Sequence, residues 1–275
     1  MAEVDEQSAG DLERAPWWSV AVDKVLQPML DLLDDFGATV MLGVQAMAWL
    51  IRPPYRWAQF LLLLDFVGAG STFIVGLVGL FTGMAFTVST IVGFRQFSAE
   101  GMVGGVVALA LARELAPVLA SVVVTARAGS TMASELGNMR VTEQIDAITT
   151  MGVSPIQYLV VPRIVATTVM LPLLAVCFGM SGMLGAYVVA VLWQAIDPGL
   201  FVDKIQQFVQ MSDLWMLVVK SALFGFIVSV ICCKKGFHAS GGARGVGEAT
   251  AKAVVASIVA IFAADYVVTT LMTKI

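Results

Sequence analysis

The sequence contains few charged residues and few of the side chains that bind metals or form disulfides. Charged residues make up 13% of the 275 residues and hydrophobic ones 59%, whereas a soluble domain has about 25% charged residues. There is one histidine, His238, and of the three cysteines Cys232 and Cys233 are adjacent. These counts disfavour both a metal site and a disulfide framework. So apolar a composition predicts a protein that lies in a lipid bilayer.

Other absences narrow the function further. The sequence has no cluster of Lys and Arg of the kind that predicts nucleic-acid binding. Its net charge is negative, and the acidic residues gather in the first 35 positions. That acidic start also lacks the basic region of a signal peptide, so we expect the first apolar span to stay in the mature protein. The sequence has no Gly-x-x-x-x-Gly-Lys-Ser/Thr phosphate loop, and its glycine-rich stretch 241–247 is predicted to be a flexible turn. A membrane enzyme is disfavoured, since one His and scattered Ser residues provide no catalytic group.

Five segments are long and apolar enough to cross a bilayer, which takes about 20 residues as a helix. They cover residues 66–94, 102–125, 164–196, 214–233 and 253–273. The predicted fold class is therefore all-α, a polytopic helical membrane protein with five transmembrane helices.

The segment before the first span has a different pattern. Residues 1–16 form an acidic tail, and residues 17–56 mix apolar residues and acids at helical spacing, with Trp17, Trp18 and Trp49 among them. Pro53 and Pro54 then favour a turn of the chain. This pattern predicts an interfacial amphipathic helix, and a sixth span is the alternative.

The distribution of basic residues predicts the orientation, because cytoplasmic loops carry an excess of Lys and Arg. With the N-terminus inside, the cytoplasmic segments contain Arg14, Lys24, Arg52, Arg56, Arg127, Arg140, Arg163, Lys234, Lys235, Arg244 and Lys252, and the outer ones Arg95, Lys204 and Lys274. Five spans then leave the C-terminus outside.

Four charged residues lie within the predicted spans, where each is costly. Arg113 and Glu114 are in the second span, Lys220 in the fourth and Asp265 in the fifth. Counting about 1.5 Å per residue from the outer ends puts them at similar depth, so we predict that Arg113 and Lys220 pair with Glu114 and Asp265. The cluster could be functional or could only lock the helices together, and an ion-coupled secondary transporter with a proton relay is the alternative function.

The cytoplasmic segment between the second and third spans predicts a short amphipathic helix. Its apolar face contains Val141, Ile145 and Ile148, and the acids Glu143 and Asp146 lie off that face. Gly152 and Pro155 are typical of a helix end. Because an acidic face disfavours anionic lipid, we expect this helix to bind a partner protein.

Several blocks of residues, in the same order, resemble a known family. They are Arg113-Glu114-Leu115-Ala116-Pro117-Val118, Ala126-Arg127-Ala128-Gly129, the run ELGNMRVTEQIDA at 135–147, Pro162-Arg163, Ala243-Arg244-Gly245-Val246-Gly247, and Asp265-Tyr266 with Thr269. In these blocks the chain is similar to the MlaE/YrbE permeases of MCE-associated ABC transporters. One departure is Ala116, where the family usually has Gly, and it concerns local helix packing.

The resemblance implies a permease domain over 57–275 with a coupling helix over 135–151 that binds the ATPase. The coupling residues it implies are Glu135, Gly137, Met139, Arg140, Val141, Thr142, Glu143, Gln144, Ile145 and Asp146. It also implies a second permease copy, an MCE-domain assembly on the outer side of the bacterial inner membrane, and phospholipid as cargo. The chain itself would be non-catalytic and bind no cofactor, with ATP and Mg on a separate cytoplasmic ATPase. The four intramembrane charges would then lie beside the lipid pathway.

Overall fold

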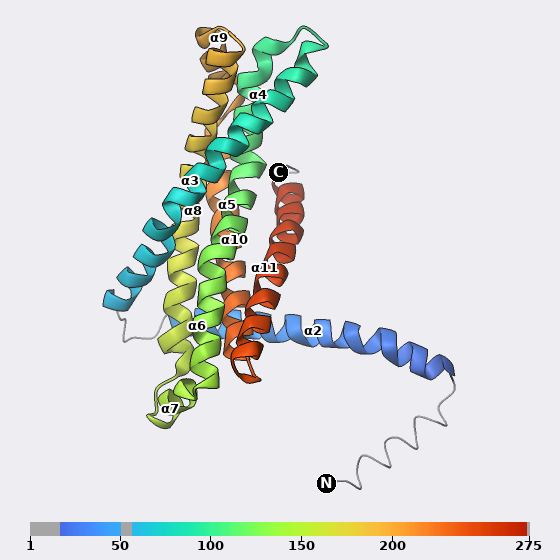
Figure 1. Cartoon of the computed structure of the whole chain (residues 1–275), viewed down its shortest axis with the longest axis vertical. Coiled ribbons are helices and arrows are strands. Elements are labelled where there is room, and N and C mark those ends of the chain that lie inside the picture. The colour runs from blue at the N-terminus through green and yellow to red at the C-terminus, as the bar shows by residue number, and fades with distance from the viewer. Residues whose placement is uncertain (1–16, 51–56, 274–275) are drawn as a thin grey trace. The chain divides into compact units, whose positions relative to one another are not determined.

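The computed structural model describes residues 17–50 and 57–273, and within these ranges the chain is helical and has no strand (Figure 1). The chain divides into two compact units, residues 1–45 and 46–275. In the first unit lies most of α2, Trp17–Leu50, a single α-helix of 34 residues. Among the described residues α2 is not one of the helices apolar enough to span a membrane. The expected helix is present, and its position at the membrane interface stays a prediction.

The second unit contains the five predicted membrane helices. Their bounds are Trp57–Arg95, Glu100–Val141, Ile156–Trp193, Met211–Phe237 and Gly242–Met272. The first, second and fourth contain the apolar run that identified them, whereas the third ends at Trp193, three residues before its predicted end at residue 196, and the fifth at Met272, one before residue 273. The second continues well past the predicted end at residue 125. A long apolar run therefore located each span, while helical structure extends beyond the apolar part.

The spans are built from the following labelled elements. The first is α3 (Trp57–Arg95); the second joins η1 (Glu100–Met102), α4 (Val103–Ala110), η2 (Leu111–Leu115), α5 (Ala116–Val124), η3 (Thr125–Gly129) and α6 (Ser130–Val141); the short α7 (Gln144–Thr150) follows; the third joins η4 (Ile156–Val160), α8 (Val161–Tyr187) and η5 (Val188–Trp193); then come α9 (Pro198–Phe208), α10 (Met211–Phe237) and α11 (Gly242–Thr273). Four of these, η2, η3, η4 and η5, are π-helical turns inside the second and third spans.

Small residues bring α3 and α8 into close contact. A Cβ added at Gly83 would collide with the backbone of Gly182, and one at Gly79 would lie 2.6 Å from the Phe178 carbonyl oxygen. Since lipid gives helices no hydrophobic reason to associate, such close backbone packing is a main source of their attraction. Gly79 and Gly83 thus fix the contact between the first and third spans.

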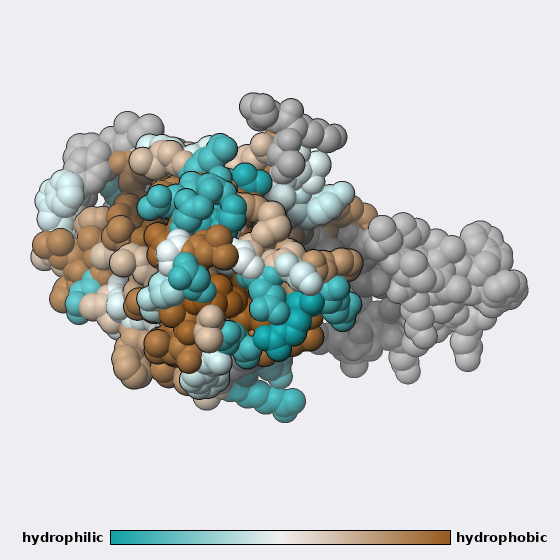
Figure 2. All heavy atoms as spheres, turned by 90° about the horizontal axis from the view of Figure 1, so that it is seen from above, coloured by the Kyte–Doolittle hydropathy of each residue, from teal (hydrophilic) through white to brown (hydrophobic). Residues whose placement is uncertain are grey.

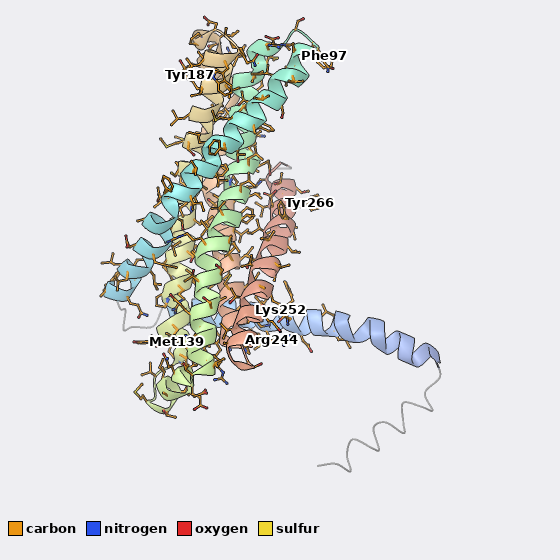
Figure 3. All side chains as sticks on the ribbon, in the orientation of Figure 1. Phe97, Met139, Tyr187, Arg244, Lys252 and Tyr266 are labelled. Carbon is orange, nitrogen blue, oxygen red and sulfur yellow. The ribbon has the colours of Figure 1, made fainter. Side chains whose placement is uncertain are left out.

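The two ends of the bundle carry different connections. One end, here called the α9 end, holds α9 and the turn between α3 and η1, and Phe97 and Tyr187 lie there (Figure 3). Seen from above, this end carries hydrophilic side chains among hydrophobic ones (Figure 2). The opposite end, the α7 end, holds α7 and the α10–α11 turn, with Met139 and Arg244 near it. The expected glycine turn is shorter than predicted, because α11 already begins at Gly242.

Candidate functional site: a buried lysine cluster and an exposed elbow

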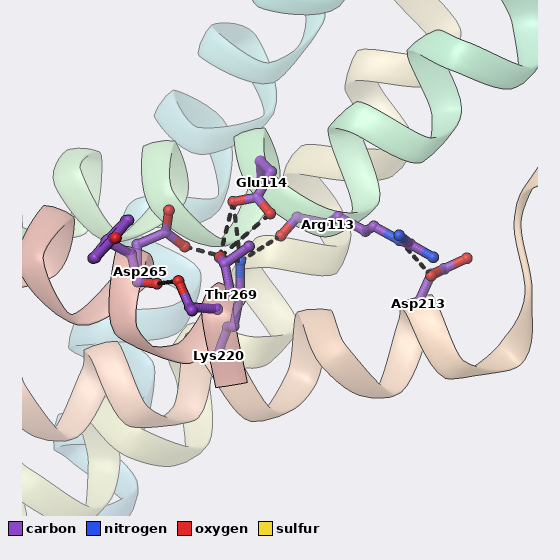
Figure 4. A network of polar contacts seen from close by, with 8 residues as sticks. Arg113, Glu114, Asp213, Lys220, Asp265 and Thr269 are labelled. Atoms are coloured by element: carbon purple, nitrogen blue, oxygen red, sulfur yellow. Dashed lines mark hydrogen bonds and ion pairs between the residues drawn. The ribbon is translucent and has the colours of Figure 1, made fainter. Parts of the chain in front are cut away.

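The ammonium group of Lys220 is the centre of a polar cluster in the middle of the apolar bundle (Figure 4). The side chain is 0% exposed. Its Nζ donates to Glu114 Oε2 at 3.0 Å, Asp265 Oδ1 at 2.9 Å and Thr269 Oγ1 at 2.6 Å. The predicted pairing of Lys220 with Glu114 and Asp265, across the second, fourth and fifth spans, is confirmed. Two carboxylates and a hydroxyl compensate the desolvation of the buried charge.

The fourth acceptor of Lys220 is a backbone carbonyl, supplied by the local sequence of the second span. The Arg113 carbonyl oxygen lies 3.0 Å from Nζ. In an α-helix this oxygen would accept from the N–H of residue 117, but that residue is Pro117 and proline has no N–H. The π-helical turn η2, Leu111–Leu115, lies at the same place and also departs from α-helical bonding. Pro117 thus leaves an acceptor available to the buried ammonium.

Arg113 does not join the Lys220 cluster through its side chain, which corrects the sequence-based pairing. Its Nε donates to Asp213 Oδ1 at 2.6 Å. Asp213 is only 2% exposed and lies in the first turn of α10, where its other oxygen accepts from the Gln210 N–H at 2.8 Å. Adjacent residues on a helix point about 100° apart, so Arg113 and Glu114 are directed to different partners.

The cluster has a closed centre and an open edge. Lys220 is fully buried, whereas the side chains of Glu114 and Arg113 are 41% and 43% exposed, and that of Asp265 is 18% exposed. The neighbouring Tyr266 of α11 is itself largely exposed. Charged groups are therefore accessible beside an apolar helix surface, an arrangement that can contact both the polar and the apolar part of an amphipathic molecule.

The predicted coupling helix consists of two helices, α6 and α7, joined by a turn. We call this turn together with α7 the elbow. α6 ends at Val141, and Glu143 has a left-handed backbone with φ 60° before α7 begins at Gln144. Arg140 Nη1 donates to Asp146 Oδ1 at 2.5 Å and so joins the two helices across the turn. The single helix expected over 135–151 is wrong, because a non-glycine residue at positive φ cannot continue an α-helix.

The elbow exposes its polar side, not its apolar one. Ile145 is buried and Val141 and Ile148 are half-buried, so the apolar face packs within the chain. The exposed residues of this segment are Thr142, Glu143, Gln144, Asp146, Ala147, Thr149 and Thr150, with Met151 just beyond α7. A partner that binds here would meet acids and amides, with one exposed methionine at their side.

The remaining predicted coupling residues lie on α6, where Glu135 is exposed and the other two are not. Glu135 pairs with Arg163 Nη2 of α8 at 3.1 Å. Gly137 is buried, and a Cβ there would lie 3.1 Å from Val246 Cγ1 of α11. Met139 is half-buried. Gly137 and Met139 therefore do not belong to the exposed surface at the elbow, and exposed Glu135 is paired with α8.

Comparison with known proteins identifies the family. The model for "Permease MlaE" matches residues 60–271. The chain belongs to the MlaE permease family. This match contains both the Lys220 cluster and the elbow, so both are parts of an MlaE-family permease.

Individual relatives agree with this MlaE assignment. A probable ABC transporter permease protein of Synechocystis is 43% identical over 209 residues, covering 76% of this chain and 80% of the relative. One of Rickettsia conorii is 36% identical over 239 residues, covering 87% and 92%. The protein trigalactosyldiacylglycerol 1, chloroplastic, of Arabidopsis thaliana is 38% identical over 223 residues, covering 81% and 64%. This MlaE-family chain is thus a multi-pass permease subunit of the ABC transporter type.

Sequence reasoning missed Asp213 as a member of the polar network of this MlaE permease. Asp213 directly precedes the apolar run that begins at Leu214, so it counted as outside the membrane. A signal was present, since Gln210 and Asp213 have the spacing of a capping box, and the structure contains that box at the start of α10. Thr269 was noted only as part of a family block, and its hydroxyl accepts from Lys220.

Proposed function

We propose that this permease moves phospholipid across or out of the bacterial inner membrane, driven by a separate cytoplasmic ATPase. A second permease copy and an MCE-domain assembly on the outer side complete the transporter. ATP and Mg bind to the ATPase, and this chain supplies the lipid pathway and the surface through which the ATPase acts.

The observation that carries the proposal is the open edge of the Lys220 cluster. Arg113 and its neighbour Glu114 expose charge inside the apolar part of the second span. A phospholipid has a charged headgroup and hydrocarbon tails, so it fits a site where ionic groups border an apolar surface. The name of the Arabidopsis relative contains that of a galactolipid, trigalactosyldiacylglycerol, which also favours lipid as the cargo class.

The elbow at α7 is the surface proposed for the ATPase. It is polar, exposed and acidic, and Arg140 holds it at a fixed angle to the long helix of the second span. A partner groove with basic residues would complement Glu143 and Asp146. The excess of Lys and Arg in the loops of the α7 end favours a cytoplasmic location for this end, with the N-terminus inside and the C-terminus outside.

An ion-coupled secondary transporter is the alternative function, and Lys220 argues against it. The two carboxylates, the Thr269 hydroxyl and the Arg113 carbonyl surround the position that a coupling cation would take, and the Lys220 ammonium already occupies it. Because Lys220 is 0% exposed, an ion would have to displace a buried charge from four acceptors.

The experiment is a test of Glu143→Lys in the complex reconstituted into phospholipid vesicles. The substitution reverses the charge at the tip of the elbow, so we expect loss of the co-purified ATPase or of lipid movement driven by ATP. Glu248→Lys is the matched control, because Glu248 is exposed at the α7 end and has only an exposed contact with Arg244. Normal amounts of ATPase together with full lipid transport in Glu143→Lys would remove the elbow from the proposed function.

A further inference from the structure

At the end of the second span, small residues make close contacts with α10 and with the chain that follows it. They meet at three successive levels towards the α7 end, four residues apart along the second span. The pairs are Gly129 with Cys232 of α10, Ala133 with Gly236 of α10, and Gly137 with Ala239, which follows α10, and Val246 of α11. Small residues at such spacing let two helices approach until their backbones touch.

The distances show how little space this contact contains. A Cβ at Gly236 would lie 2.5 Å from the Ala133 carbonyl oxygen, and one at Gly137 would lie 3.2 Å from Ala239 Cβ. Ala133, Gly137 and Gly236 are all buried. A shift of one helix along the other would force atoms into positions already filled, because packed interiors have discrete arrangements and do not deform continuously.

α10 extends from this contact to the Lys220 cluster without interruption. It is a continuous α-helix over Met211–Phe237, and Lys220 lies about 24 Å from Gly236 at about 1.5 Å per residue. The second span offers a less regular route between the same two places, since η2 and η3 are π-helical turns within it. Movement applied to α6 therefore reaches Lys220 most directly through α10.

We infer that α6, the adjoining half of α10 and the first turns of α11 move as one rigid body, and that Gly137 is the positioning residue that holds the elbow to it. Gly137 acts through Ala239 and Val246 and does not touch the ATPase. The inference rests on the proposed function, in which the elbow receives the movement of the ATPase. It adds the route by which that movement reaches the ionic cluster.

A size series at position 137 tests the role of this glycine. Gly137→Leu drives a wedge between α6 and α11, so the ATPase should still co-purify while the lipid moved per ATP hydrolysed falls by about tenfold, as expected when a conformational step is misaligned. Gly247→Leu is the matched control, because a Cβ added at position 247 has no neighbouring atom within 4 Å among residues 17–50 and 57–273. Adding Val246→Ala to Gly137→Leu should restore part of the lipid moved per ATP hydrolysed, because the smaller side chain at 246 makes room for the leucine.

Two results would overturn the role of Gly137. One is a ratio in Gly137→Leu equal to that of Gly247→Leu. The other is loss of the ATPase from Gly137→Leu, which would assign position 137 to the docking surface itself.

A disulfide lock tests the rigid body independently of residue 137. A Cβ at position 129 would lie 3.0 Å from Cys232 Sγ, so Gly129→Cys can bond to this native cysteine. Cys177→Ala and Cys233→Ala remove the other thiols from both this protein and its unlocked parent. After oxidation with copper phenanthroline, transport of a fluorescent phospholipid should stay within about twofold of the reduced sample, because a bond across a contact that does not move removes no step.

The lock has outcomes that separate the inference from the proposed function. Position 129 directly precedes α6, so transport that disappears on oxidation and returns on reduction would show that the start of α6 and α10 slide, and would overturn the rigid body. Failure of the bond to form would overturn the contact between positions 129 and 232. Parent protein that moves no lipid with its ATPase would count against the proposed function instead.

Discussion

Replacing Lys220 by Met removes the one cation that pairs with Glu114 and Asp265 within residues 17–50 and 57–273. Both carboxylates then lie near each other in the membrane interior without a partner charge. Breaking a buried ion pair by removing one member costs about 3–5 kcal/mol, and Lys220 is 0% exposed with four acceptors within 3.0 Å, so this range applies. For a unit of this size, about 2–4 °C of melting temperature is lost per kcal/mol.

A second substitution shows whether the loss comes from the unpaired charge. Asp265 is the more buried of the two acids, at 18% exposed against 41% for Glu114. Lys220→Met combined with Asp265→Leu removes both members of the deeper pair, which is often nearly neutral for stability. We therefore expect the double variant to be more stable than Lys220→Met alone, with a coupling free energy above about 1 kcal/mol, as for residues in direct contact.

The assay is the midpoint of thermal unfolding of the purified protein in detergent, followed by size-exclusion chromatography with fluorescence detection. Lys204→Met is the matched control, since Lys204 bonds only to exposed Gln207 on α9 and should change stability by less than about 0.5 kcal/mol. Two results would refute the reasoning about a compensated buried charge. One is the same melting temperature for Lys220→Met and Lys204→Met, and the other is additive stability losses from the substitutions at 220 and 265.

Two further predictions concern the α9 end and the topology. Asp213→Ala should lower the free energy of unfolding by about 1–3 kcal/mol, because it leaves the Arg113 side chain unpaired and removes a capping hydrogen bond of α10. Asp203→Ala, on the exposed face of α9, is the control and should leave it unchanged, so equal melting temperatures of the two variants would contradict the prediction. Ser98→Cys should react in intact cells with a thiol reagent that cannot cross the membrane, and Arg244→Cys should not, because basic loops stay inside; labelling at position 244 would reverse the proposed orientation.

The sequence by itself determined the membrane class and the five spans, and it predicted that four charges lie at similar depth. An apolar run of about 20 residues is a local property, so it can be read without knowing the neighbours of the helix. The prediction of a charge cluster followed from depth alone, since opposite charges at one level of an apolar bundle have few alternatives to each other, but depth left open which acid each base contacts. The family blocks added the permease assignment.

Only the tertiary structure decided which way each helix faces, and this is where the sequence-based expectations were wrong. Arg113 reaches Asp213 and not the cluster, Ile145 packs inward and not toward a partner, and Gly137 contacts α11 rather than the elbow surface. These contacts depend on the direction in which each side chain leaves its helix. A π-helical turn shifts the directions of the side chains that follow it from those expected at 3.6 residues per turn. The positive φ at Glu143, which divides the expected helix, depends likewise on the packing of α7, because glutamate has little preference of its own for that conformation.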